Sequence, residues 1–120
     1  MTAEDVNEVV KGLKTRIGAL ACALISRDGT VLSAEMPEGV YSETFAIMCA
    51  TMLGAAATSN TELNRAPPAH VLVEGPDSKM FIVGCGKKTL LAAMVGHDRD
   101  TMATLDELSK VAELTHSLYN

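Results

Sequence analysis

The sequence predicts an α/β (α+β) three-layer sandwich, in which helices cover both faces of a five-stranded sheet. Segments with helical and with strand periodicity follow one another in the order αββαβββα. Several strand segments are apolar at every position, which is typical of strands covered on both sides. Of the 120 residues, 48% are hydrophobic and 21% charged, a mixture typical of globular rather than disordered chains. We therefore expect a single domain over residues 1–120.

The first element is predicted to be a helix from Thr2 to about Arg16. Thr2 suits the cap position, acidic residues follow it in the first turn, and Gly18 suits the helix end. The apolar residues recur at steps of three and four, as one buried helical face requires: Val6, Val9, Val10, Leu13 and Ile17.

A β-hairpin is predicted next. The segment Ala19–Ile25 is apolar throughout and reads as a central strand. Asp28-Gly29 supplies the positive φ that tight hairpin turns need, and Thr30–Ala34 returns as the second strand.

A long helix is expected to follow, capped by Ser42 and running to about Leu63, which corresponds to roughly 33 Å. On a helical wheel, its core-facing stripe consists of Phe45, Met48, Cys49, Met52, Leu53 and Ala56. The opposite face should be charged if it met water. It instead carries Ala46, Ile47, Ala50, Thr51, Gly54, Ala57 and Thr58.

This second face of the helix is predicted to contact another protein chain. Glu62 is the only charged residue between positions 46 and 63, and small residues recur every four positions. Small residues at that spacing let two helices approach closely. The alternatives are that a loop of the same chain covers this face, or that it is exposed.

Three strands and a helix complete the chain: His70–Glu74, Met80–Cys85, Thr89–Val95 and Thr101–Leu118. Asp100 suits a cap for the last helix, and Thr104 with Glu107 could form an internal capping box. The predicted buried stripe of this helix is Met102, Leu105, Leu108, Val111, Ala112 and Leu118.

The strand His70–Glu74 has the pattern of a sheet edge. Val71 and Val73 share one face, and the other face carries His70, Leu72 and Glu74. Polar residues on one face fit an edge strand, and an unpaired edge can recruit a second chain. A two-fold dimer could pair this strand and the long helix with their own copies.

No catalytic, cofactor or metal site is predicted. Gly84-Cys85-Gly86 lacks the third glycine of a dinucleotide fingerprint and precedes a strand. His70, His97 and His116 fall on separate elements without ligand spacing. The three cysteines stand in apolar runs, as buried reduced thiols of a cytosolic protein would.

The charge of the chain argues against nucleic acid as a partner. The formal net charge is −5 and aromatics make up only 3% of residues, so neither phosphate binding nor base stacking is favoured. No signal peptide is visible at the acidic start, and no hydrophobic stretch approaches the roughly 20 residues of a membrane span. We therefore expect a cytoplasmic protein without membrane insertion.

These residues together resemble the roadblock/LC7 (dynein light chain) family, in its bacterial and archaeal form. The resemblance rests on three stretches: the hairpin from Gly18 to Leu32, the helix from Phe45 to Ala57, and Met80-Phe81-Ile82-Val83. It implies an antiparallel, longin/profilin-like sheet with the second helix on one face and the terminal helices on the other. It also implies homodimers, or heterodimers with a paralogous roadblock chain, joined through the third strands and second helices.

The resemblance also implies a function. Family members have no chemistry of their own and bind small Ras-like GTPases or motor subunits, in processes such as polarity, motility and trafficking. The sequence thus predicts a dimeric adaptor that regulates or scaffolds a small GTPase. The alternatives are a structural light-chain subunit without nucleotide dependence and, ranked below it, a small-ligand sensor.

Overall fold

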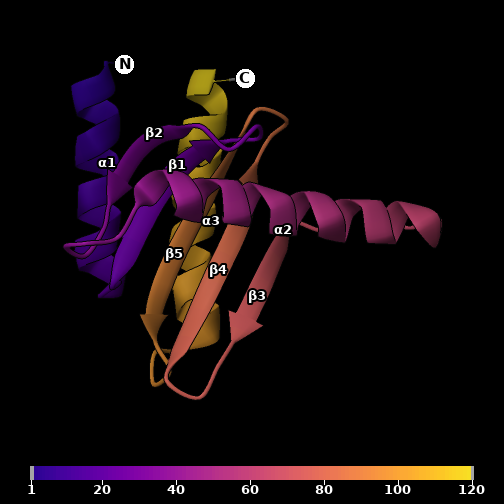
Figure 1. The fold of residues 1–120 in the computed structure, drawn as a ribbon. Helices are drawn as coiled ribbons and strands as arrows, with labels where there is room; N and C mark the ends of the chain where they lie inside the picture. Colours follow the sequence, from indigo (N-terminus) through magenta and orange to yellow (C-terminus); the bar gives the residue numbers. More distant parts are fainter. Residues whose placement is uncertain (1, 120) are drawn as a thin grey trace.

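The computed structural model describes residues 2–119 and has the predicted order of elements (Figure 1). All strand pairs are antiparallel, and the sheet order is β2-β1-β5-β4-β3. The observed boundaries lie within two residues of the predicted ones: α1 Ala3–Ile17, β1 Ala21–Ser26, β2 Val31–Glu35, α2 Ser42–Glu62, β3 His70–Glu74, β4 Ser78–Cys85, β5 Thr89–Gly96 and α3 Thr101–Tyr119.

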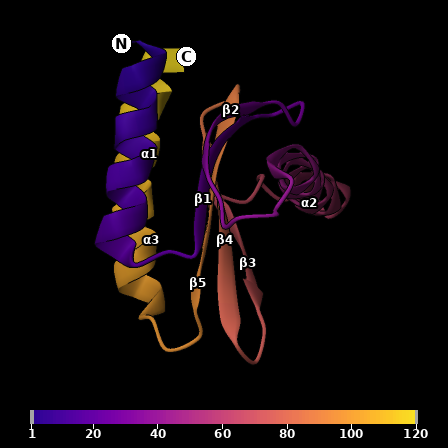
Figure 2. The same cartoon turned by 60° about the vertical axis from the view of Figure 1, so that its left-hand side comes forward.

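The three layers are as predicted. Figure 2 shows α1 and α3 together on one face of the sheet and α2 alone on the other. Each interface has its own apolar core. The α1/α3 side is centred on Leu13, Phe81, Leu91 and Leu108, and the α2 side on Ile25, Leu53, Ile82 and Leu90. Strand β1 lies between both layers, which explains why its first five residues are all buried.

Helix α1 begins and ends as its sequence predicts. The Thr2 hydroxyl accepts a hydrogen bond from the Asp5 backbone N–H (3.2 Å), and the Asp5 carboxylate accepts one from the Thr2 backbone N–H (3.0 Å). The bond from the Thr2 backbone N–H, followed by one from the Thr2 hydroxyl to the same carboxylate, lowers the pKa of the Asp5 carboxyl. Gly18 ends the helix with φ 63°, and a Cβ there would touch the guanidinium group of Arg99. The left-handed conformation favours glycine, whereas the Arg99 side chain could move to make room for a Cβ.

The turn between β1 and β2 brings the hairpin tip against α2. The Asp28 carboxylate accepts a hydrogen bond from the Thr30 backbone N–H (3.2 Å), and Gly29 has φ 91°. A Cβ on Gly29 would lie 3.2 Å from the Ile47 Cα. This glycine therefore permits both the turn and the close approach of α2.

Helix α2 does not use the predicted cap. Tyr41 occupies the cap position and makes no side-chain capping bond, whereas Ser42 is already the first helical residue. The Ser42 hydroxyl donates to the neighbouring Glu43 carboxylate (3.4 Å) instead. The prediction of Ser42 as cap was wrong by one position, because the loop enters the helix one residue earlier.

Helix α3 starts at the predicted cap, Asp100, whose carboxylate accepts a hydrogen bond from the Ala103 backbone N–H (2.8 Å). The internal capping box was wrong. Thr104 is already an interior residue of the helix and its side chain is buried; its hydroxyl donates to the Asp100 carbonyl (2.7 Å). Glu107 points away to the surface, where it pairs with Arg16.

The predicted buried stripe of α3 is correct at its centre and wrong at its start. Leu108, Val111 and Ala112 are buried, but Met102 is 74% exposed. The buried positions include Thr104, and a residue two positions before it lies about 200° away around the helix. The side chain of Leu118 lies outside the described residues.

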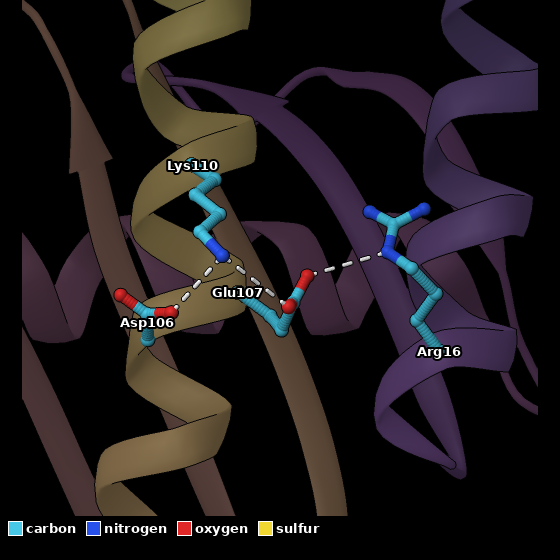
Figure 3. A network of polar contacts seen from close by, with 4 residues as sticks. All are labelled: Arg16, Asp106, Glu107 and Lys110. Carbon is cyan, nitrogen blue, oxygen red and sulfur yellow. Dashed lines mark hydrogen bonds and ion pairs between the residues drawn. The ribbon is translucent and has the colours of Figure 1, made fainter.

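A surface network joins α1 to α3 (Figure 3). The Arg16 Nε lies 3.3 Å from Glu107, whose other oxygen lies 3.7 Å from the Lys110 ammonium. Lys110 also pairs with Asp106 at 3.2 Å, and this bond raises the pKa of Lys110. Ion pairs between such exposed side chains contribute little to stability. The packing of α1 and α3 on the sheet therefore depends on their apolar core rather than on this network.

Candidate partner-binding surface of α2 and β3

The buried side of α2 differs from the side that the helical wheel indicated. Ala46, predicted to face outward, is fully buried in the core under α2 together with Cys49 and Leu53. Ala50 packs against the same core, whereas Met48, predicted to face inward, is 50% exposed. Between positions 46 and 61 this helix carries apolar, small or uncharged polar side chains on every face, so no charged side chain marks the face that meets water. Periodicity therefore predicted the helix but placed its buried face wrongly.

The outward side of α2 is uncharged and exposed, as expected. Ile47 is 49% exposed, and Thr51, Gly54 and Thr58 are exposed as well. Ala57 is half-buried. Of the seven α2 residues predicted for a contact with another chain, Ala46 is buried in the protomer, and Ala50 is half-buried against the same core.

The second half of α2 extends beyond its own sheet. Leu53 is its last buried residue, and Figure 1 shows the helix continuing past the edge strand β3. Residues 54–62 contain four small apolar positions, several hydroxyl or amide side chains and one charge. Asn60 ends this overhang in an ordered turn, because its side chain donates to the Ala66 carbonyl (2.9 Å) and its own carbonyl accepts from the Arg65 N–H (2.8 Å). The second half of α2 is thus an ordered helix that extends past the sheet of its own protomer.

Strand β3 lies at the edge of the sheet, as its sequence predicted, with β4 as its neighbour. Val71 packs against the core under α2 and Leu72 against the core on the opposite face. His70, Val73 and Glu74 are exposed, with Val73 at 42%. The structure thus brings the free edge of β3 next to the overhang of α2 (Figure 1).

An apolar strip of the sheet beside α2 is only partly covered. Val73, Met80 and Met94 stand opposite one another on three neighbouring strands, on the α2 side. Val73 is exposed and both methionines are half-buried. In Figure 1 these strands run on past α2 toward the β3–β4 turn. Sequence reasoning missed this strip, because it depends on where α2 crosses the sheet.

A groove lies on the other side of α2. Ala50, Gly54 and Ala57 form its helical wall, and the groove has a volume of about 480 Å³. Its remaining walls come from the segment before β3 and from the turn between β4 and β5: Pro67, Pro68, Gly86 and Lys87, with Arg27 at the side and Leu53 at the base.

The thiols are not activated. Cys22, Cys49 and Cys85 are all buried, and none of them forms a disulfide within residues 2–119. Burial raises the pKa of the Cys22 thiol to about 12 and that of Cys49 to about 11, so both are protonated at neutral pH. Among residues 2–119 no three metal-ligating side chains cluster, and no helix is long and apolar enough to cross a membrane.

The comparisons with known proteins agree with this architecture. The model of the Roadblock/LC7 domain matches residues 5–94. An uncharacterized protein of Methanocaldococcus jannaschii is 23% identical over 91 residues, which cover 76% of this chain and 77% of that protein.

Solved structures share the fold at low sequence identity. MglB of Myxococcus xanthus has a TM-score of 0.91 at 13% identity, covering 98% of this chain and 89% of that one. The gliding protein MglB of Thermus thermophilus gives 0.83 at 18%, covering 96% and 88%. An MglB structure described as having a tetrameric arrangement gives 0.87 at 20%, covering 96% and 88%.

The fold class extends further. Profilin II of Acanthamoeba castellanii has a TM-score of 0.69 at 15% identity, covering 93% of this chain and 97% of that one. The predicted profilin-like fold is thereby confirmed. Because the family model covers more than half of the sequence, the chain belongs to the Roadblock/LC7 family.

Proposed function

We propose that this protein is a non-catalytic, dimeric adaptor that binds and regulates a small Ras-like GTPase in the cytoplasm. The observation that carries the proposal is the overhang of α2 beside the free edge of β3. Both features leave surface exposed that a monomer would normally cover. Membership of the Roadblock/LC7 family and the likeness to MglB proteins support the GTPase as partner.

The dimer would form around a two-fold axis at the edge of β3. Pairing β3 with its own copy joins two five-stranded sheets and satisfies the free backbone groups of both edges. The overhang of each α2 then reaches over the second copy, where the strip of Val73 and Met80 is open. Small side chains in the overhang permit close packing there.

The side of α2 that would meet the second copy follows from helical geometry. Ala50 and Gly54 face the groove near the β4–β5 turn. Met52 lies about 200° around the helix from Ala50, and Ala56 lies about 200° from Gly54, so both face the open strip of the sheet. We therefore place the contact between the two α2 helices along Met52 and Ala56, with β3 beneath.

The dimer itself would present the GTPase with a broad surface made of both α2 helices. The four arginines, Arg16, Arg27, Arg65 and Arg99, are scattered along the chain, and none stands out as an inserted catalytic group. We therefore expect any acceleration of GTP hydrolysis to act by repositioning the GTPase's own residues. The alternative is a scaffold that holds its partner regardless of nucleotide.

Two measurements test the proposal. Light scattering of the purified protein should give the mass of a dimer at micromolar concentration. Purified small Ras-like GTPases of the source organism should then bind with different affinity when loaded with GDP or with a non-hydrolysable GTP analogue. Equal binding in both states would favour the scaffold. A monomer, or binding to no GTPase, would refute the proposed adaptor.

A further inference from the structure

The groove beside α2 is open along its helical wall. The wall residues at positions 50, 54 and 57 have at most a methyl side chain, and a Cβ added to Gly54 would meet no atom within 4 Å. Leu53 is buried at the base, and Pro67 and Pro68 form an apolar wall opposite. The groove could therefore accept the side chains of another protein segment without rearrangement.

The rim of the groove is positive. Arg27 and Lys87 belong to its lining, which includes no carboxylate, although the chain has 15 acidic and 10 basic residues. Neither cation forms an ion pair within residues 2–119. An acidic side chain entering the groove would thus meet two positive charges and no repulsion from the lining.

Arg27 is held in place for this contact. Its Nε donates to the Thr89 carbonyl (2.9 Å), and its Nη2 donates to the Gly86 carbonyl. Its backbone N–H also donates to the Lys88 carbonyl (2.9 Å). Guanidinium has five N–H donors, so several remain for an incoming carboxylate. Because the protein has already ordered this side chain, little conformational entropy is lost on binding.

The groove is separate from the proposed dimer contact. It lies on the side of α2 that faces the β4–β5 turn, whereas Met52 and Ala56 face the open strip of the sheet. A second copy docked on that strip would leave the groove open in each protomer.

We propose that this groove binds an acidic segment of the partner protein. One Asp or Glu of the segment pairs with Arg27 and Lys87, and small apolar side chains pack against Ala50, Gly54 and Ala57. The inference rests on the proposed function, because it assigns part of the GTPase contact to this groove.

A peptide probe tests the groove without any GTPase. Nuclear magnetic resonance of the ¹⁵N-labelled protein would be recorded with a capped peptide of alanine and glutamate, and with its alanine and glutamine analogue. The acidic peptide should shift the amide signals of Gly54, Ala57 and Lys87, and added salt should weaken binding of the peptide. Shifts confined to other surfaces, or equal shifts with the glutamine peptide, would overturn the inference.

Two variants carry the test to the GTPase. Gly54→Leu fills the groove with a residue that favours helix more than glycine does, and Lys87→Glu reverses the charge of the rim. Each should weaken GTPase binding by about tenfold or more, as expected for loss of a desolvated contact. The matched controls are Ala103→Leu on α3 and Lys11→Glu on α1, both exposed positions on the other face of the sheet.

The outcomes separate the inference from the proposed function. If the wild type binds the GTPase and both groove variants bind equally well, the groove inference is wrong and the adaptor stands. If Lys87→Glu alone has no effect, the acidic character of the segment is wrong. If Gly54→Leu dissociates the dimer in light scattering, a second copy fills the groove and the inference is overturned. If the wild type binds no GTPase, the proposed function falls, and the peptide experiment alone decides the groove.

Discussion

Replacing Val73 by aspartate should dissociate the proposed dimer. Val73 lies on the edge strand β3, on the face that α2 of a second copy would cover. In the protomer its side chain is 42% exposed. A two-fold contact uses every residue twice, so one substitution removes two valines from the contact and introduces two carboxylates into it.

The magnitude follows from the exposed fraction. Complete burial of a valine contributes about 1.5–3 kcal/mol, so burying the remaining 42% contributes about 1 kcal/mol per copy. Two copies give about 2 kcal/mol, which corresponds to a roughly 30-fold increase in the dimer dissociation constant. Burying the two carboxylates adds a desolvation cost, so roughly 30-fold is a lower bound.

Sedimentation equilibrium over a range of concentrations would measure the dissociation constant. The matched control is Val40→Asp, because Val40 is 46% exposed but lies in the loop before α2. Circular dichroism would check that both variants keep their helices. A Val73→Asp protein that dimerises as tightly as Val40→Asp would show that β3 is not the dimer contact.

Three further predictions concern the protomer. Gly18→Ala should lower the free energy of unfolding by about 1–2 kcal/mol, because residue 18 has φ 63°. Gly12→Ala, inside the same helix, should raise the free energy of unfolding by up to about 1 kcal/mol, because alanine favours helix more than glycine does. Urea unfolding would measure both changes. Asp100→Ala should cost about 1 kcal/mol in the same assay through loss of the α3 cap, and an unchanged midpoint would contradict that role. Cys22 and Cys49, with pKa values of about 12 and about 11, should react with iodoacetamide at pH 8 only after unfolding, and fast labelling of the native protein would contradict their burial.

Local signals in the sequence predicted the elements well. The hairpin around Asp28-Gly29, the capping residues Thr2 and Asp100, and the edge character of His70–Glu74 each depend on a few adjacent residues. Their physical basis is short-range: a positive φ, a hydrogen bond to a helix N–H, or alternation along a strand. Such features depend little on the tertiary contacts of the rest of the chain.

The orientation of α2 was not predictable in the same way. The helical wheel assigned Ala46 and Met48 to the wrong faces of α2. Every face of this helix carries apolar or small side chains, so no charged residue indicates which face meets water. Contact with β1 and with the hairpin tip at Gly29 decides which side is buried. The groove lined by Ala50 and Lys87 depends on that choice, so the sequence pattern could not indicate it.

The sequence by itself determined the order of elements, the layered architecture and the presence of an uncharged long helix beside an edge strand. Only the tertiary structure decided that α2 overhangs β3, that Val73 and Met80 form an open strip on one side of it, and that a basic groove lies on the other. The reason is that periodicity and capping act over a few residues. The crossing point of a helix on a sheet depends on side chains far apart in the chain, and the surfaces left open for partners depend on that crossing point.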